Sequence, residues 1–243
     1  MSAFERPHHR RIARVLDSLD DALLRADHCW FGGGTAIALR HGEYRESVDI
    51  DFMISDLAGY RDLRHRLLGA RTLAAVTRDG QPPMTLEREV RADQYGIRMF
   101  VMLDDVPVKC EIVHEGRIRF DEPGQRDRVG RISTLSSIDM AASKLLANAD
   151  RWLDTSVFSR DVLDLAMLDL APRFLGPALD KATHAYGEVI GRDAQRAVKV
   201  LRSDPDRLRN CMHALSITLP QAVMQEALRI LARRLNRCTA HAP

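Results

Sequence analysis

The chain has 243 residues, 45% of them hydrophobic and 29% charged, with a net charge of +2, as is typical of a globular protein of one large or two small domains. No apolar run approaches the roughly 18 residues that a membrane-spanning helix needs, and no apolar stretch follows the charged N-terminus, so a membrane-spanning protein is excluded and a cytoplasmic protein without a signal peptide is predicted. The four cysteines form no CxxC pair and have no histidine at zinc-ligand spacing, so neither a structural zinc site nor a disulfide framework is predicted.

The first 45 residues predict a helix, a short strand and a second helix. One amphipathic helix is predicted over residues 8–27 from apolar residues at helical spacing, namely Ile12, Leu16, Leu19 and Leu23. The apolar run 29–31 is strand-like and ends at three glycines, 32–34, whose composition indicates a turn. A short helix is predicted over residues 35–40. His8 and His9 are expected to belong to a disordered terminus.

The next predicted strand covers residues 48–54, where apolar and polar residues alternate. Because side chains alternate along a strand, Asp49 and Asp51 are expected on one face, roughly 7 Å apart. The opposite, core face is assigned to Val48, Ile50 and Phe52.

A hairpin and then a helical part follow. Strands are predicted over residues 96–103 and 106–113, joined by two aspartates, and an edge strand over 130–135. Ser136 and Asp139 resemble a capping box, and the pattern is helical from there to the end. A cap residue followed by proline also predicts that a helix starts at residues 204–205.

These elements predict two domains, an α/β domain over residues 1–135 and a helical domain over 136–243. Residues 171–243 hold 12 Lys and Arg against 6 Asp and Glu, or +6, so the preceding part carries −4. A basic C-terminal part is compatible with a polyanionic partner and equally with solvated helices. The last helix is expected to bury Val223, Ala227, Ile230 and Leu231. Its basic ridge, which suits RNA phosphates or the helix dipole, is formed by Arg229, Arg233 and Arg237.

Asp49 and Asp51 are the first candidates for a metal site. Two carboxylates on one face of a rigid strand suit Mg²⁺, which takes a few protein oxygens together with substrate phosphates. The glycines upstream allow close backbone approach, and a helix opening at Thr35 would offer its free N–H groups to phosphate oxygens. A D-x-D pattern alone is common on solvated strands, so a further carboxylate is needed to make the pattern informative.

Glu111 is the candidate third carboxylate and metal ligand. Val108, Cys110 and Ile112 share one face of their strand, which places Glu111 on the other. A lone glutamate in a buried strand is costly unless it is paired or bound to metal. In a two-metal site Glu111 would help to deprotonate an attacking hydroxyl, while the metals stabilise an in-line displacement.

The stretch FGGGTAIALRHGEYRESVDIDF, residues 31–52, resembles the polymerase-β type nucleotidyltransferase superfamily, whose pattern is an apolar residue, two small residues, a short helix and D-h-[DE]-h. More narrowly, it resembles the AbiEii family, which contains toxins of type IV toxin–antitoxin systems and the related MenT toxins. That likeness rests on Gly33, Gly34, Thr35, Ala36, Leu39, Gly42, Arg45, Ser47, Asp49, Asp51 and Phe52. Lys144 on a helix and the later segment 160–165 (RDVLDL) are also similar to this family. No motif covers residues 55–130 or the tail beyond 171.

The resemblance implies a fold, an activity and a set of site residues. The fold would be α+β, with a polymerase-β-like mixed sheet, flanking helices and a C-terminal helical region. The activity would be transfer of a nucleoside monophosphate from an NTP, with Mg²⁺, to an RNA such as a tRNA 3′ end, with a cognate antitoxin as a partner. The implied roles are triphosphate contact for Gly33, Gly34 and Ser47, metal binding for Asp49 and Asp51, triphosphate or base contact for Lys144, and completion of the site by Asp161. A third glycine, Gly32, leaves open which two touch phosphate.

Alternatives stay open at this point. The same site would serve to nucleotidylate a small molecule such as an aminoglycoside, or a protein side chain, and a non-catalytic binding protein would also keep the fold. Without the resemblance, Lys144 would be a solvated charge, and Arg160 and Asp164 a surface pair. Arg40 and Arg45 would either steady phosphates or lie in a solvated turn.

Overall fold

The computed structural model describes residues 4–239, which divide into two compact units. Unit 1 comprises Met1–Glu43 and Ser47–Ser136, and unit 2 comprises Tyr44–Glu46 and Ser137–Pro243. The expectation that the N-terminus is no signal peptide rests partly on residues 1–3, which lie outside the described residues. From residue 4 to residue 239, no helix is both long enough and apolar enough to span a bilayer.

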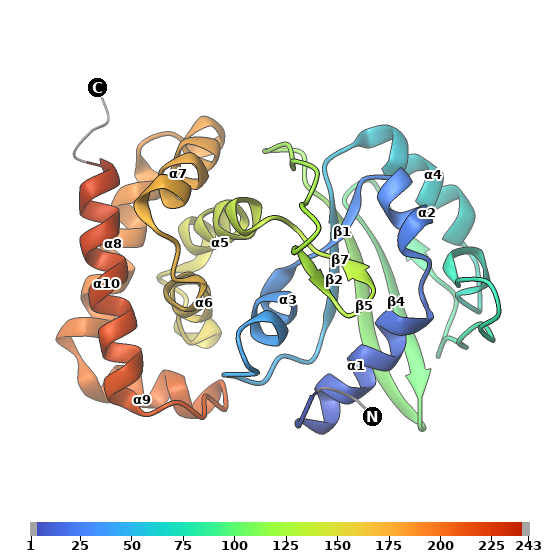
Figure 1. Cartoon of the computed structure of the whole chain (residues 1–243), viewed down its shortest axis with the longest axis horizontal. Coiled ribbons are helices and arrows are strands. Elements are labelled where there is room, and N and C mark those ends of the chain that lie inside the picture. The colour runs from blue at the N-terminus through green and yellow to red at the C-terminus, as the bar shows by residue number, and fades with distance from the viewer. Residues whose placement is uncertain (1–3, 240–243) are drawn as a thin grey trace. The chain divides into compact units, whose positions relative to one another are not determined.

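Unit 1 is built on a mixed five-stranded sheet (Figure 1). Its strands in spatial order are β1 (Cys29–Phe31), β2 (Ile50–Ile54), β5 (Val106–His114), β4 (Gly96–Leu103) and β3 (Arg91–Ala92). Strands β2 and β5 are parallel, and the other neighbours are antiparallel. A separate ribbon pairs β6 (Arg128–Val129) with β7 (Ile132–Ser133). The mixed sheet confirms the predicted α+β class.

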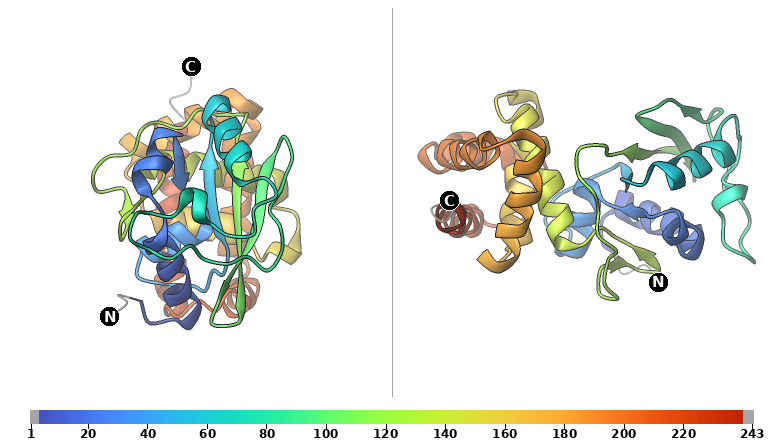
Figure 2. Two further views of the ribbon diagram at one scale, coloured as in Figure 1. Left: turned by 90° about the vertical axis from the view of Figure 1, so that its right-hand side faces the viewer. Right: turned by 90° about the horizontal axis from the view of Figure 1, so that it is seen from above.

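The helices of unit 1 are α1 (Pro7–Ser18), α2 (Asp21–Ala26), α3 (Gly33–Arg40), α4 (Leu57–Leu67) and the 3-10 helix η1 (Ala74–Val76). Helices α1, α2 and α4 lie over one face of the sheet in both orientations (Figures 1 and 2). The predicted single helix over 8–27 is wrong because Leu19 is extended. The Asp20 side chain then accepts hydrogen bonds from the N–H groups of Ala22 and Leu23 and caps a new helix.

The β4–β5 hairpin sorts side chains between a buried face and an open face. On β5, Val108 and Cys110 are buried and Lys109 is not, as the alternation predicted. The two turn residues, Asp104 and Asp105, have φ of 51° and 59°. Positive φ at both central residues is the signature of a type I′ turn, whose twist matches that of the strands. The predicted hairpin is therefore confirmed.

Between residues 137 and 239, the regular secondary structure of unit 2 is all helical. Its helices are α5 (Ser137–Arg151), η2 (Thr155–Val157), α6 (Arg160–Leu168), α7 (Pro172–Tyr186), α8 (Val189–Ser203), α9 (Pro205–Ala214) and α10 (Gln221–Thr239). Asp204 caps α9 by accepting from the Arg207 N–H, which confirms the predicted helix start. The predicted buried stripe of α10 is confirmed at Leu231 and wrong at Val223, which is exposed. The other buried residues of the helix are Met224, Leu228 and Leu235.

Candidate active site

Asp51 and Glu111 lie next to each other on the open face of the unit 1 sheet. They are register partners on the parallel strands β2 and β5, and register partners project from the same face. Asp49 lies just before β2, which begins at Ile50. The predicted strand is thus two residues too long at its start, and Val48 is 43% exposed instead of lying in the core.

The glycine run brings backbone directly against the Asp51 carboxylate. Gly33 has φ of +66°, and a β-carbon there would lie 2.5 Å from Oδ2 of Asp51. The N–H of Gly32 donates to the Asp51 carbonyl oxygen at 2.7 Å. Helix α3 begins at Gly33, two residues earlier than predicted. Its first N–H groups, which have no intrahelical acceptor, therefore belong to Gly33, Gly34 and Thr35.

We expect Gly33→Ala to lower both stability and nucleotide binding. The left-handed backbone costs an alanine about 1 kcal/mol, and the new methyl group would displace the Asp51 carboxylate. Gly42→Ala is the matched control, since Gly42 has φ of +73° and a β-carbon added there would meet no atom of the described residues within 4 Å. Urea denaturation and Mg²⁺-dependent NTP binding would be measured for both. Equal effects of the two substitutions on stability and on NTP binding would show that the contact between Gly33 and Asp51 does not matter for function.

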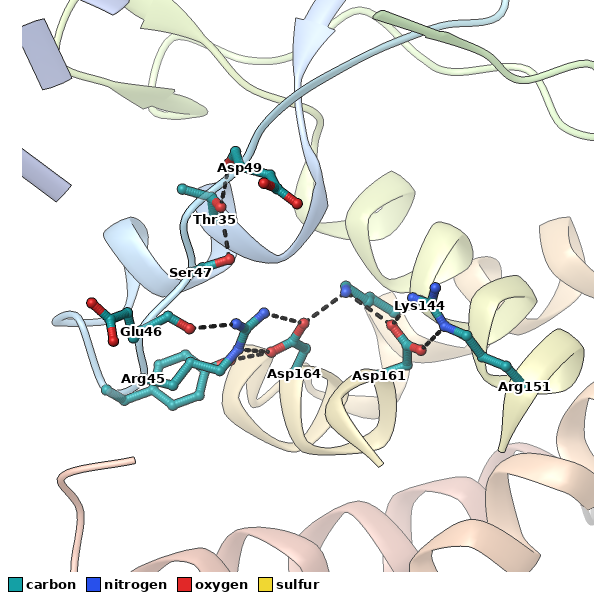
Figure 3. Close-up of polar contacts among 10 residues, drawn as sticks. Thr35, Arg45, Glu46, Ser47, Asp49, Lys144, Arg151, Asp161 and Asp164 are labelled. Carbon is teal, nitrogen blue, oxygen red and sulfur yellow. Dashed lines mark hydrogen bonds and ion pairs between the residues drawn. The ribbon is translucent and has the colours of Figure 1, made fainter. Parts of the chain in front are cut away.

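Thr35 and Ser47 fix the backbone just before β2 (Figure 3). Oγ1 of Thr35 lies 2.6 Å from the Asp49 carbonyl oxygen and 2.7 Å from Oγ of Ser47. Because a carbonyl oxygen only accepts, the Thr35 hydroxyl donates to Asp49, and the Ser47 hydroxyl donates to Thr35. The side chain of buried Thr35 thus positions the backbone of Asp49. Only the backbone N–H of Thr35 is left for the predicted contact with phosphate.

His9 supports the same segment from α1. The Ser47 N–H donates to Nε2 of His9 at 3.2 Å, and Nδ1 of His9 lies 2.7 Å from Oε1 of Glu43. A histidine that accepts at Nε2 and faces a carboxylate at Nδ1 carries its proton on Nδ1. His9 is fully buried, so the expectation of a disordered terminus is wrong there. No sequence pattern relates it to residues 38 positions away.

Two cations neutralise Glu111. The Lys109 ammonium lies 3.3 Å from Oε2 of Glu111 and 3.9 Å from Oδ2 of Asp49, and Nε of Arg98 lies 2.8 Å from Oε1 of Glu111. Partial burial opposes the charged form of Lys109, but the carboxylates of Asp49, Glu111 and Asp51 outweigh it and raise the lysine's pKa. The half-buried Glu111 is therefore paired, which removes the need for a metal to satisfy it.

The donor set fits Mg²⁺ with two protein ligands. Within residues 4–239, no three His, Cys, Asp or Glu side chains are grouped to hold a metal ion. Asp49 and Asp51 supply two carboxylates, and Mg²⁺ takes one or two of these while keeping waters and phosphate oxygens as its other ligands. Because Gly33 has no β-carbon, the start of α3 lies directly against the Asp51 carboxylate.

A buried ionic cluster in unit 2 centres on Asp164 (Figure 3). Asp164 has no exposed surface and accepts from the Tyr44 hydroxyl, from Nε of Arg45 at 2.7 Å and from Nζ of Lys144 at 2.7 Å. Burial acts to raise the pKa of Asp164, but Lys144 and Arg45 lower it overall. The predicted surface pair with Arg160 is therefore wrong, as is a solvated turn at Arg45.

Lys144 also binds Asp161 in this cluster. Its ammonium lies 3.0 Å from Oδ1 of Asp161, and Nε of Arg151 lies 2.7 Å from Oδ2. Burial favours neutral Lys144, yet Asp164 and then Asp161 raise its pKa. Lys144 is thus charged and buried, not solvated. The structure brings Lys144 and Asp161 together, and their predicted roles toward the triphosphate stay predictions.

Comparison with known proteins gives one matching family and several similar solved structures. The family described as nucleotidyl transferase AbiEii toxin, type IV TA system, matches residues 14–237. MenT4, a nucleotidyltransferase toxin from Mycobacterium tuberculosis H37Rv, is 17% identical, with 98% of this chain and 87% of that chain covered and a TM-score of 0.54. A protein from H. pylori described as a candidate nucleotidyltransferase is 16% identical, with 96% and 93% covered and a TM-score of 0.48. The search of curated proteins found no match.

Proposed function

The chain belongs to the AbiEii family of nucleotidyltransferase toxins, and on this premise we propose that it transfers a nucleoside monophosphate from an NTP to the 3′ end of a tRNA. The observation that carries the proposal is the contact of Gly33 with the Asp51 carboxylate beside Asp49. Any larger residue at position 33 would displace the Asp51 carboxylate from its place beside the start of α3. The transfer joins the acceptor hydroxyl oxygen to the α-phosphorus and releases pyrophosphate.

Different residues of unit 1 would bind the metal and the triphosphate. Asp49 and Asp51 would hold Mg²⁺, which when bound supplies charge neutralisation to the phosphates. The first N–H groups of α3 are oriented to receive triphosphate oxygens, and the dipole of that helix favours negative charge at its start. The Ser47 hydroxyl must turn from Thr35 in order to donate to a phosphate. Glu111 as a third ligand stays a prediction.

The charge of the C-terminal part supports a polyanionic acceptor over a cationic one. Residues 171–243 carry a net charge of +6, whereas a cationic acceptor such as an aminoglycoside calls for an acidic pocket. The type IV toxin–antitoxin family also implies a cognate antitoxin as a partner. The intact carboxylate pair and glycine contact favour an enzyme over a non-catalytic relative that keeps only the fold.

An acceptor-labelling experiment tests this function. The protein would be incubated with Mg²⁺ and each α-³²P NTP, separately with total tRNA, total protein and an aminoglycoside. We expect label on tRNA from at least one NTP, and none on tRNA whose terminal ribose has been oxidised with periodate, because the acceptor hydroxyl is then gone. Label on protein or on the aminoglycoside alone would replace the tRNA acceptor, and label on no acceptor would contradict the proposed transfer.

A further inference from the structure

A groove in unit 1, outside the segments covered by any sequence motif, has four cationic side chains and one carboxylate in its lining. It has a volume of about 430 Å³ and runs along β3, β4 and β5. Its charged lining residues are Arg88, Arg91, Arg98, Lys109 and a single carboxylate, Asp93. Such a lining attracts anions and repels cationic ligands.

The groove is the basic end of a row of charged side chains that crosses the open face of the sheet. Successive register partners on β2, β5, β4 and β3 are Asp51, Glu111, Arg98 and Arg91. Lys109 lines the groove, and its ammonium lies 3.9 Å from Asp49. The groove is therefore continuous with the carboxylates of the candidate active site.

Two arginines of the groove differ from Arg98 in having no carboxylate partner within residues 4–239. Arg98 pairs with Asp93 and Glu111, but in the part of the chain that the structure describes neither Arg88 nor Arg91 forms an ion pair. Arg91 stands directly opposite Arg98, and like charges in register cost stability. The Arg88 guanidinium lies 4.5 Å from the centre of the Phe100 ring. Positive charges that no carboxylate balances, at Arg88 and Arg91, indicate that the groove binds an anionic ligand.

A second arginine-lined groove, beside α2, shows the contrast. Its volume is about 520 Å³, and it is lined by Arg25, Arg78, Arg128 and Arg131. Each of these four arginines pairs with a carboxylate of the protein. The carboxylates of the protein already balance the positive charge of this groove. The groove is therefore a matched control and not a second candidate site for an anionic ligand.

We propose that the groove lined by Arg88 and Arg91 binds the phosphodiester backbone of the RNA acceptor and leads its terminal hydroxyl to the carboxylates. This assignment rests on the proposed nucleotidyl transfer. Arg88 and Arg91, which have no carboxylate partner among residues 4–239, are suited to bind phosphates of a chain. Phe100 with the Arg88 guanidinium offers planar surfaces on which bases stack. The NTP triphosphate is one compact anion, for which the glycine turn is the site.

Salt-dependent binding of 5′-labelled total tRNA tests the groove. We expect Arg88→Gln/Arg91→Gln to weaken tRNA binding about 10-fold or more at roughly 100 mM salt and to reduce the slope of log K against log salt concentration by about two, one for each lost phosphate contact. Mg²⁺-dependent binding of NTP alone, measured by calorimetry, should stay unchanged. Thermal stability should stay close to that of the wild type, because relief of the like charges of Arg91 and Arg98 offsets the loss of the contact between Arg88 and Phe100.

Arg78→Gln/Arg131→Gln removes the same charge from the other groove and should leave the slope within about 0.5 of the wild type. Equal losses in the two double variants would overturn the assignment, as would undetectable tRNA binding by the wild-type protein. Loss of NTP binding in the Arg88/Arg91 variant would also overturn it and place the triphosphate in the groove. If the groove variant loses tRNA binding while the wild-type protein labels no acceptor, the groove assignment stands and the proposed transfer fails.

Discussion

Replacing Asp51 with asparagine is expected to lower the rate of nucleotidyl transfer by about 1,000-fold, which corresponds to about 4 kcal/mol of lost transition-state stabilisation. The substitution keeps the shape that packs against Gly33 but removes the charge needed to hold a divalent cation. Single-turnover rates with saturating tRNA and Mg²⁺ would measure the effect. Stability should be unchanged or slightly higher, because charged functional sites are commonly maintained at a cost to folding.

Glu111→Gln is the matched control, because Glu111 is the register partner of Asp51 on the same face. Its carboxylate already binds Arg98 and Lys109, so we expect a loss of about tenfold, comparable to that of an outer-shell partner. A loss of about 1,000-fold in Glu111→Gln, equal to that in Asp51→Asn, would establish the predicted third metal ligand. Full activity of Asp51→Asn would contradict the placement of the active site on this sheet.

Asp164→Asn is expected to destabilise the protein by about 3–5 kcal/mol, the usual cost of leaving a buried charge without its partner. Arg45 and Lys144 would both lose the carboxylate that balances them. For a chain of this size the thermal midpoint should fall by roughly 10 °C. Asp206→Asn, which breaks an exposed pair with Arg209, should cost less than about 1 kcal/mol. A similarly small effect in Asp164→Asn would show that the cluster does not stabilise the fold.

The same cluster is expected to make the free energy of unfolding fall at acidic pH. The pKa of Asp164 and that of Asp161 are both lowered in the folded protein. A depressed carboxyl pKa contributes stability that is fully present above the unfolded value, about 3.9, and is lost as pH falls through the folded value. The wild-type protein should therefore lose its advantage over Asp164→Asn below about pH 4. An advantage that stays constant down to about pH 2 would contradict this assignment.

Local patterns were sufficient to predict much of unit 1. Alternation predicted β2 and β5, and their register then places Asp51 beside Glu111. The two aspartates between β4 and β5 predicted the hairpin because positive φ is tolerated there. The glycine run was interpreted as a turn, since nothing in the sequence shows that Gly33 must make room for the Asp51 carboxylate.

Long-range pairing accounts for what the sequence could not predict. Asp164 looked like half of a helical surface pair, but its partner Arg45 is 119 residues away. His9 and Ser47 meet across 38 residues, and the basic groove brings Arg88 and Lys109 into one lining. The N-terminal helix was extended too far because periodicity continues across Asp20, whose capping bonds end the pattern.

The most direct test of nucleotidyl transfer compares α-³²P with γ-³²P labelling of the same NTP, with Mg²⁺ and tRNA, in the wild-type protein and in Asp51→Asn. Nucleotidyl transfer predicts label on tRNA from the α-phosphate only, with pyrophosphate released, and a loss of that label in the variant. Label from the γ-phosphate would contradict it by showing phosphoryl transfer, and α-label that persists in Asp51→Asn would show that the chemistry does not depend on the carboxylates beside Gly33.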